Sequence, residues 1–142
     1  MSTLTSLIRL RKHTVDQKQK FLAGLYRQAE ELEQKKASLQ EKLSRERQLL
    51  EEQEMLEALA WFGNFAAGVK TQIEFIDKDI ANMEQRIEIA RGDLRNAFAE
   101  LKKIEITNER RIAAAQKEEQ VKENKELDEI GIEGHRRKEE NN

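Results

Sequence analysis

Few residues in this sequence are able to do chemistry, and their spacing supports no catalytic group. The two histidines are His13, between Lys12 and Thr14, and His135, beside Arg136. Nucleophilic catalysis needs a serine or cysteine held next to a base. The sequence has no cysteine, and neither histidine is placed to pair with a serine. We therefore predict no catalytic residue and no enzymatic activity.

Motifs for metals and cofactors are also missing. The acidic run Glu51-Glu52-Gln53-Glu54 lacks the ligand spacing of a calcium loop. Without cysteine there is no zinc-thiolate site, and neither GxxxxGK[ST] nor GxGxxG occurs. We expect no metal and no cofactor, so the chain should act by interaction with partners.

The composition points to long helices. Charged residues make up 38% of the 142 residues, aromatic residues make up 5%, and proline is absent. A disordered chain this polar usually carries proline, whereas a long helix excludes it. The formal net charge of -2 argues against a general polyanion binder, and no apolar run reaches the roughly 20 residues that span a bilayer. We expect a cytoplasmic helical protein that binds no nucleic acid and does not insert into a membrane.

One apolar seam runs along the first part of the chain. Its positions recur every three or four residues over seven heptads, with charged interruptions at Arg11, Lys18, Lys36 and Glu46. This spacing is typical of a coiled coil and predicts a helix over residues 3–59. The apolar members are Leu4, Ile8, Val15, Leu22, Leu25, Ala29, Leu32, Leu39, Leu43 and Leu50.

A second seam is apolar at every position. It predicts a second helix over residues 66–130, and its register shifts after Ile104, at Asn108 and Arg111. Its members are Phe62, Ala66, Val69, Ile73, Ile76, Ile80, Met83, Ile87, Ala90, Leu94, Ala97, Leu101 and Ile104.

Between the seams lies the strongest turn signal, Gly63-Asn64. We predict a tip turn over residues 60–65, which makes the chain an all-α protein: one long two-helix antiparallel coiled-coil hairpin over residues 1–142. With this turn Leu43 faces about Ile80, Leu22 faces about Leu101, and Leu4 reaches about residue 119. The glycines at 131 and 134 predict a frayed tail over 131–142.

Charge is uneven along the chain and supports the antiparallel arrangement. Residues 1–48 have a net charge of +5 and residues 116–142 have a net charge of -3. An antiparallel hairpin would bring these segments together, whereas a parallel homodimer would stack Arg11 on Arg11 and Lys18 on Lys18. We expect a monomer, with a homodimeric coiled-coil adaptor as the alternative.

Exposed apolar residues are the candidates for partner binding. Trp61, Phe62 and Phe65 cluster at the predicted tip, where they either close the hairpin or anchor a partner. Phe75 and Ile89 are both at heptad position c, outside the seam, and could form a stripe for a partner helix.

Three segments resemble the FliJ family of flagellar type III export proteins, and the resemblance extends over nearly the whole chain. They are the opening Leu4-Thr5-Ser6-Leu7-Ile8-Arg9-Leu10-Arg11, the stretch from Trp61 to Val69, and the tail from Lys125-Glu126-Leu127-Asp128-Glu129-Ile130 to Arg136-Arg137-Lys138. The resemblance implies the fold of the central stalk of rotary ATPases and a part in flagellum biogenesis, motility and chemotaxis. It also implies a location at the inner-membrane export apparatus, as a peripheral protein.

The same resemblance implies three partners: the hexameric export ATPase FliI, the export gate protein FlhA, and export chaperones. The paired termini would enter the ATPase ring, with contacts from Ile8, Arg9, Arg11, Lys12, Leu127, Asp128, Ile130, Arg136 and Arg137. Gate contact would fall on Gln72, Phe75, Ile76, Asp79 and Met83. The equivalent stalk of a virulence type III secretion system stays open as an alternative.

Overall fold

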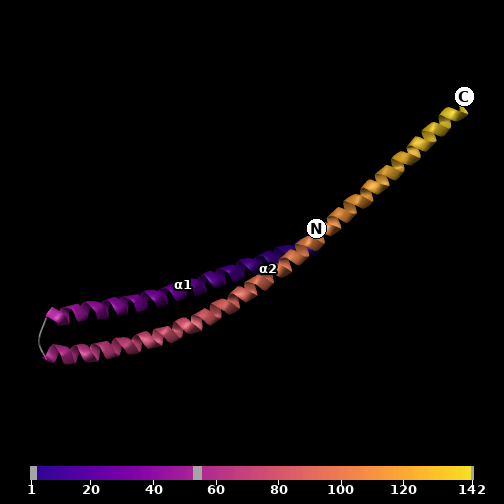
Figure 1. Ribbon diagram of the computed structural model, residues 1–142. Coiled ribbons are helices and arrows are strands. Elements are labelled where there is room, and N and C mark those ends of the chain that lie inside the picture. The colour runs from indigo at the N-terminus through magenta and orange to yellow at the C-terminus, as the bar shows by residue number, and fades with distance from the viewer. Residues whose placement is uncertain (1–2, 53–55, 142) are drawn as a thin grey trace. The chain divides into compact units, whose positions relative to one another are not determined.

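The computed structural model describes residues 3–52 and 56–141 and contains two helices. Helix α1 spans Thr3–Glu52 and helix α2 spans Leu56–Glu140 (Figure 1). The described residues contain no strand. The two helices pack against each other, which confirms the predicted all-α helical hairpin.

The chain divides into two compact units, which we describe separately. The hairpin unit comprises residues 13–97, and the terminal unit comprises residues 1–12 and 98–142. In the hairpin unit α1 and α2 run antiparallel, joined at the closed end between Glu52 and Leu56 (Figure 1).

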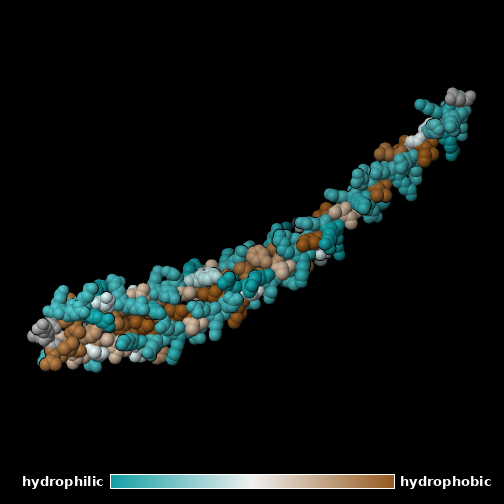
Figure 2. Space-filling model, viewed as in Figure 1, coloured by the Kyte–Doolittle hydropathy of each residue, from teal (hydrophilic) through white to brown (hydrophobic). Residues whose placement is uncertain are grey.

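The core of the hairpin unit is a row of apolar side chains between the helices. Leu25 is only 2% exposed and clusters with Met83 and Ala90. Burying one such aliphatic side chain contributes about 1.5–3 kcal/mol. Figure 2 shows apolar side chains between hydrophilic ones along this unit. The partly buried neighbours of the cluster are Leu22, Ala29, Leu32 and Ile87.

Both predicted seams are confirmed position by position. Every seam residue is buried or half-buried, including the charged interruptions Arg11, Lys18, Lys36 and Glu46. Lysine and arginine tolerate this because their aliphatic stems cover apolar surface while the charged ends reach water.

The predicted tip turn is wrong. Residues 60–65 are helical and belong to α2, while α1 ends at Glu52 instead of continuing to residue 59. The described glycines have no positive φ, so Gly63 does not act as a turn residue. A glycine inside a helix costs about 1 kcal/mol, and this is outweighed because a helical 60–65 brings Phe62, Phe65 and Ala66 into half-buried positions.

The end of α1 also has an electrostatic reason. Glu51 and Glu52 lie at its C-terminus, where the helix dipole disfavours negative charge, and no basic residue lies in its last turn. Glu57 lies in the first turn of α2, where the dipole favours a carboxylate. Residues 53–55 lie outside the described residues.

The earlier helix break changes the register of the pairing. Leu43 was expected to face about Ile80, but its neighbour Lys42 lies over the ring of Phe65, much nearer the closed end. Leu22 was expected to face about Leu101, but it packs against the Leu25 cluster beside Ile87. The predicted register is therefore wrong, because it was counted from a turn that does not exist.

In the terminal unit, α2 continues past the short α1 segment as a single helix. Leu101 is buried, and Ile8 and Ile104 are half-buried. From residue 109 to residue 141 every residue is exposed. We call residues 109–140 of α2 the C-terminal arm. The expectation that Leu4 reaches about residue 119 is wrong, and the basic first segment does not cover the acidic arm.

The predicted frayed tail is also helical, to Glu140. Local contacts explain this result. Arg137 and Lys138 lie in the last turn, where cations complement the helix dipole, and His135 Nε2 lies 3.2 Å from Glu139 Oε1. The Asn141 backbone N–H donates to the Arg137 carbonyl at 3.2 Å. Within the described residues, neither helix contains a stretch apolar enough to cross a membrane.

Candidate functional site

Three grooves of the hairpin unit open on one side of the helix pair. Each is bordered by residues at heptad position c or g of both helices. We call this side of the hairpin unit the grooved face. The first groove, of about 740 Å³, is lined by Glu31, Gln34, Lys35, Ser38, Leu39, Gln72, Phe75 and Ile76. The second, of about 540 Å³, is lined by Gln28, Glu31, Leu32, Lys35, Asp79, Asn82, Met83 and Arg86. The third, of about 330 Å³, is lined by Thr14, Gln17, Lys18, Phe21, Ala90 and Asp93.

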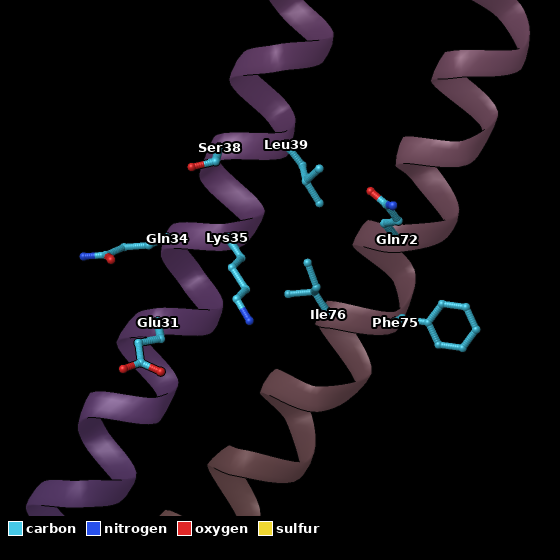
Figure 3. Close-up of a pocket in the computed structure, with 8 residues that line it drawn as sticks. All are labelled: Glu31, Gln34, Lys35, Ser38, Leu39, Gln72, Phe75 and Ile76. Atoms are coloured by element: carbon cyan, nitrogen blue, oxygen red, sulfur yellow. The ribbon is translucent and has the colours of Figure 1, made fainter.

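The first groove has an apolar floor. Figure 3 shows Leu39 and Ile76 pointing between the helices, whereas the ring of Phe75 points away from α1. Phe75 is 63% exposed, although it is one of the largest apolar side chains of the unit. It therefore forms an outer edge of the groove that a partner can reach.

Large apolar side chains follow one another along this face of α2. Trp61, Phe75 and Ile89 are all exposed and lie at fourteen-residue intervals, each at position c. The predicted stripe of Phe75 and Ile89 is thus exposed and continues to Trp61. The Trp61 ring stacks on Phe65, with centroids 5.2 Å apart and planes 10° apart. They are single exposed side chains and not a continuous patch, but all three lie on one face of α2, which makes this face a candidate interaction surface.

Lysines accompany the aromatic rings. Lys42 Nζ lies 5.6 Å from the Phe65 ring centroid, and Lys78 Nζ lies 5.7 Å from that of Phe75. Lys35 lines the first groove between the helices (Figure 3). Such cation–π pairs contribute about 0.5–1 kcal/mol at exposed sites, and they keep positive charge beside the apolar row.

The structure brings all five predicted gate residues to the grooved face. Gln72, Phe75 and Ile76 line the first groove, and Asp79 and Met83 line the second. Met83 is buried against Leu25 and Ala90, so its main contact is with the hairpin core. Their contact with a gate protein stays a prediction.

The predicted tip residues Trp61, Phe62 and Phe65 lie in the first turns of α2 instead of in a turn. Phe62 is half-buried, while Trp61 and Phe65 border the grooved face.

The residues predicted to enter an ATPase ring all belong to the terminal unit, but in two separate places. On α1, Arg9 and Lys12 are exposed, whereas Ile8 and Arg11 are half-buried. The Arg11 Nε is buried and has no hydrogen-bond partner among the described residues. On the C-terminal arm the predicted residues are all exposed: Leu127, Asp128, Ile130, Arg136 and Arg137. The expected pairing of the two termini is wrong, because α2 alone forms the arm.

On the opposite side of the hairpin unit an ion pair links α1 to α2. Lys36 Nζ lies 2.7 Å from Asp77 Oδ1. The hydrogen bond and the charge of Asp77 raise the pKa of Lys36. No cluster of three or more potential metal ligands occurs in the described part of the chain.

Sequence reasoning missed the lysines of the grooved face. Lys35 and Lys42 are seven residues apart at position g of α1, and this spacing was available in the sequence. Their aromatic neighbours on α2 were not, because these depend on the register between the helices.

The comparisons with known proteins gave one match. A family model described as flagellar FliJ protein matches residues 1–140 of the chain. No curated protein and no solved structure matches the chain.

Proposed function

The chain belongs to the FliJ family, a family of flagellar export components, and on this premise we propose that it is a non-catalytic stalk of the flagellar type III export apparatus. The stalk enters the hexameric export ATPase FliI and stimulates it. It also contacts the export gate FlhA and escorts export chaperones. It acts as a monomer at the cytoplasmic side of the inner membrane.

The exposed C-terminal arm is the part of the chain that supports the proposed contact with the ATPase. The arm is a single helix whose apolar residues Leu127 and Ile130 are 65% and 67% exposed. A single helix fits a narrow central opening better than the helix pair that sequence reasoning expected there. Weak charge contacts from Arg136 and Arg137 suit a part that must not lock in one orientation.

The grooved face supports the gate contact. Gln72, Phe75 and Asp79 border its grooves with atoms that a partner can reach. This leaves separate surfaces for the two partners, the arm for FliI and the grooved face for FlhA.

The test is ATP hydrolysis by the same organism's export ATPase, with and without the full chain. We expect a higher rate with the chain, and loss of this stimulation in the double variant Leu127→Ser with Ile130→Ser. Both side chains are exposed, so the fold should be unaffected. The matched control is Ile89→Ser, equally exposed but on the grooved face, which should still stimulate.

Absence of stimulation by the folded full chain would overturn the stalk proposal and favour the adaptor. Equal stimulation by the double variant would exclude Leu127 and Ile130 from the ring contact.

A further inference from the structure

We propose that the grooved face binds the grooved face of a second copy of the chain, in a two-fold dimer centred on Gln28 and Asn82 with the two copies antiparallel. The inference adds a partner to the proposed function and does not rest on it. The dimer covers residues of the proposed gate contact, so it is a reserve form, and the monomer is the form that acts at the export apparatus.

The charges of the grooved face are balanced and unpaired. The side chains that line the three grooves include three bases and three acids: Lys18, Lys35, Arg86, Glu31, Asp79 and Asp93. None of the six forms an ion pair within the described residues. Equal numbers of both charges favour no partner of one sign, but they allow the face to pair with itself where opposite charges meet.

The exposed apolar side chains are arranged symmetrically about the middle groove. Gln28 and Asn82 line this groove from α1 and α2, so they lie level with each other. Phe21 is seven residues before Gln28, and Phe75 is seven residues before Asn82. Because the helices are antiparallel, the two phenylalanines lie about 10.5 Å to either side of the centre. They are 58% and 63% exposed.

On α2 this symmetry gives every important side chain a fitting partner. In a two-fold dimer, residues at equal steps before and after the centre meet, and each contact is made twice. Phe75 is seven residues before Asn82 and meets Ile89, seven residues after it, which is 67% exposed. Asp79, three residues before the centre, meets Arg86, four residues after it. The dimer therefore gains two apolar contacts and two ion pairs.

On α1 the same axis passes through Gln28. Phe21 meets Lys35, which is seven residues after Gln28, and an ammonium group over an aromatic ring is a favourable contact. Glu31, three residues after the centre, meets Gly24 and no second acid.

The charges also select this register. If the copies slide by one heptad in one direction, Arg86 meets Arg86 and Asp79 meets Asp93. In the other direction Asp79 meets Asp79. Like charges at an interface are unfavourable. In the register centred on Asn82 these contacts disappear, and Asp93 meets the neutral Gln72.

The dimer should be weak and reversible. The stretch from Phe21 to Lys35 extends over about 21 Å, which is short for a stable interface. We expect monomers at about 1 μM and dimers at about 100 μM of the full chain. Sedimentation equilibrium over this range measures the dissociation constant.

The decisive experiment exchanges charges between copies. Arg86→Asp puts an acid opposite Asp79, and Asp79→Arg puts a base opposite Arg86, so each variant alone should dimerise at least about tenfold more weakly. An equimolar mixture of the two variants restores opposite charges across the interface and should dimerise at least as well as the wild type. Both side chains are exposed, so the fold should survive. The matched control is Arg91→Asp, at position e on the other side, which should dimerise normally.

A crosslink tests the register. The chain has no cysteine, so Asn82→Cys introduces a single thiol on the two-fold axis, where it faces its own copy. A short bifunctional thiol reagent should join the copies of this variant at about 100 μM. The control Glu84→Cys is exposed at position e and should crosslink far less.

A full chain that stays monomeric at about 100 μM would overturn the proposal, as would a mixture of the two charge variants that stays monomeric. Equal crosslinking of the two cysteine variants would overturn the register. Arg86→Asp should still stimulate the export ATPase, because the C-terminal arm is unchanged. Failure of the dimer is therefore distinguishable from failure of the stalk proposal.

Discussion

In the hairpin unit α1 and α2 cover each other's seam residues, whereas the C-terminal arm is exposed along its whole length. Leu25 in the hairpin unit is 2% exposed and Leu127 in the arm is 65% exposed. Both residues belong to long helices, yet the first is held by packing and the second is largely open to solvent.

The arm is helical for local reasons. It contains no proline, and His135 Nε2 lies 3.2 Å from Glu139 Oε1, one helical turn away. Each such pair contributes only about 0.2–0.5 kcal/mol. Isolated helices in water are marginal, so the arm should open and re-form far more readily than the hairpin unit. The comparison shows that helix content does not measure packing.

The largest expected effect is that of removing a buried side chain. Leu25→Ala should lower the free energy of unfolding by about 2–5 kcal/mol, because it leaves a cavity between the helices. Leu127→Ala should change it by less than about 0.5 kcal/mol. Urea titrations followed by circular dichroism measure both values. Similar losses in the two variants would mean that the arm is packed in solution.

A proline substitution in the hairpin unit and another in the C-terminal arm test the same difference in stability. Ala81 and Ala113 are both exposed positions in the interior of α2, and a proline in a helix interior costs about 3 kcal/mol or more. Ala81→Pro should lower the melting temperature of the main transition. Ala113→Pro should remove helical signal at low temperature and leave that transition in place. A main transition shifted equally by both would show that hairpin unit and arm unfold together.

The smallest expected effect concerns the ion pair of Lys36 and Asp77. Asp77 raises the pKa of Lys36 in the folded chain above its unfolded value. The resulting stabilisation is complete at neutral pH and is lost as the pH rises through the folded pKa. Lys36→Met should therefore reduce the loss of thermal stability between neutral and strongly alkaline pH. The effect should be small, because both side chains are partly exposed. An alkaline loss of the same size in the variant would mean that the pair contributes nothing in solution.

The seams could be predicted because heptad spacing encodes the buried side of a helix directly. Even Arg11 and Lys18, charged residues at core positions, lie where the spacing puts them. The position of the turn could not be predicted, because the conformation that its residues prefer locally differs from the one that buries their apolar neighbours. Gly63-Asn64 favours a turn by itself, but helical residues 60–65 extend the seam to Phe62 and shelter Phe65.

The candidate site was predictable to the extent that it depends on one helix. Phe75 and Ile89 share a side of α2 whatever faces them, so heptad counting found them. The contact of Lys42 with Phe65 depends on where the chain reverses. One misplaced turn therefore shifted every cross-helix pair in the expected hairpin, although the apolar seam of each helix was predicted correctly.

Because the two helices are antiparallel, residues that pack together are translated several seconds apart. Leu25 packs against Met83, which is translated about 58 residues later. At about 5–20 residues per second the ribosome adds that stretch in roughly 3–12 seconds. During this time the apolar side of α1 has no partner in its own chain and is open to chaperones or to other nascent chains. Once residue 97 is made, every part of the hairpin unit exists, and it can close while the arm is still being translated.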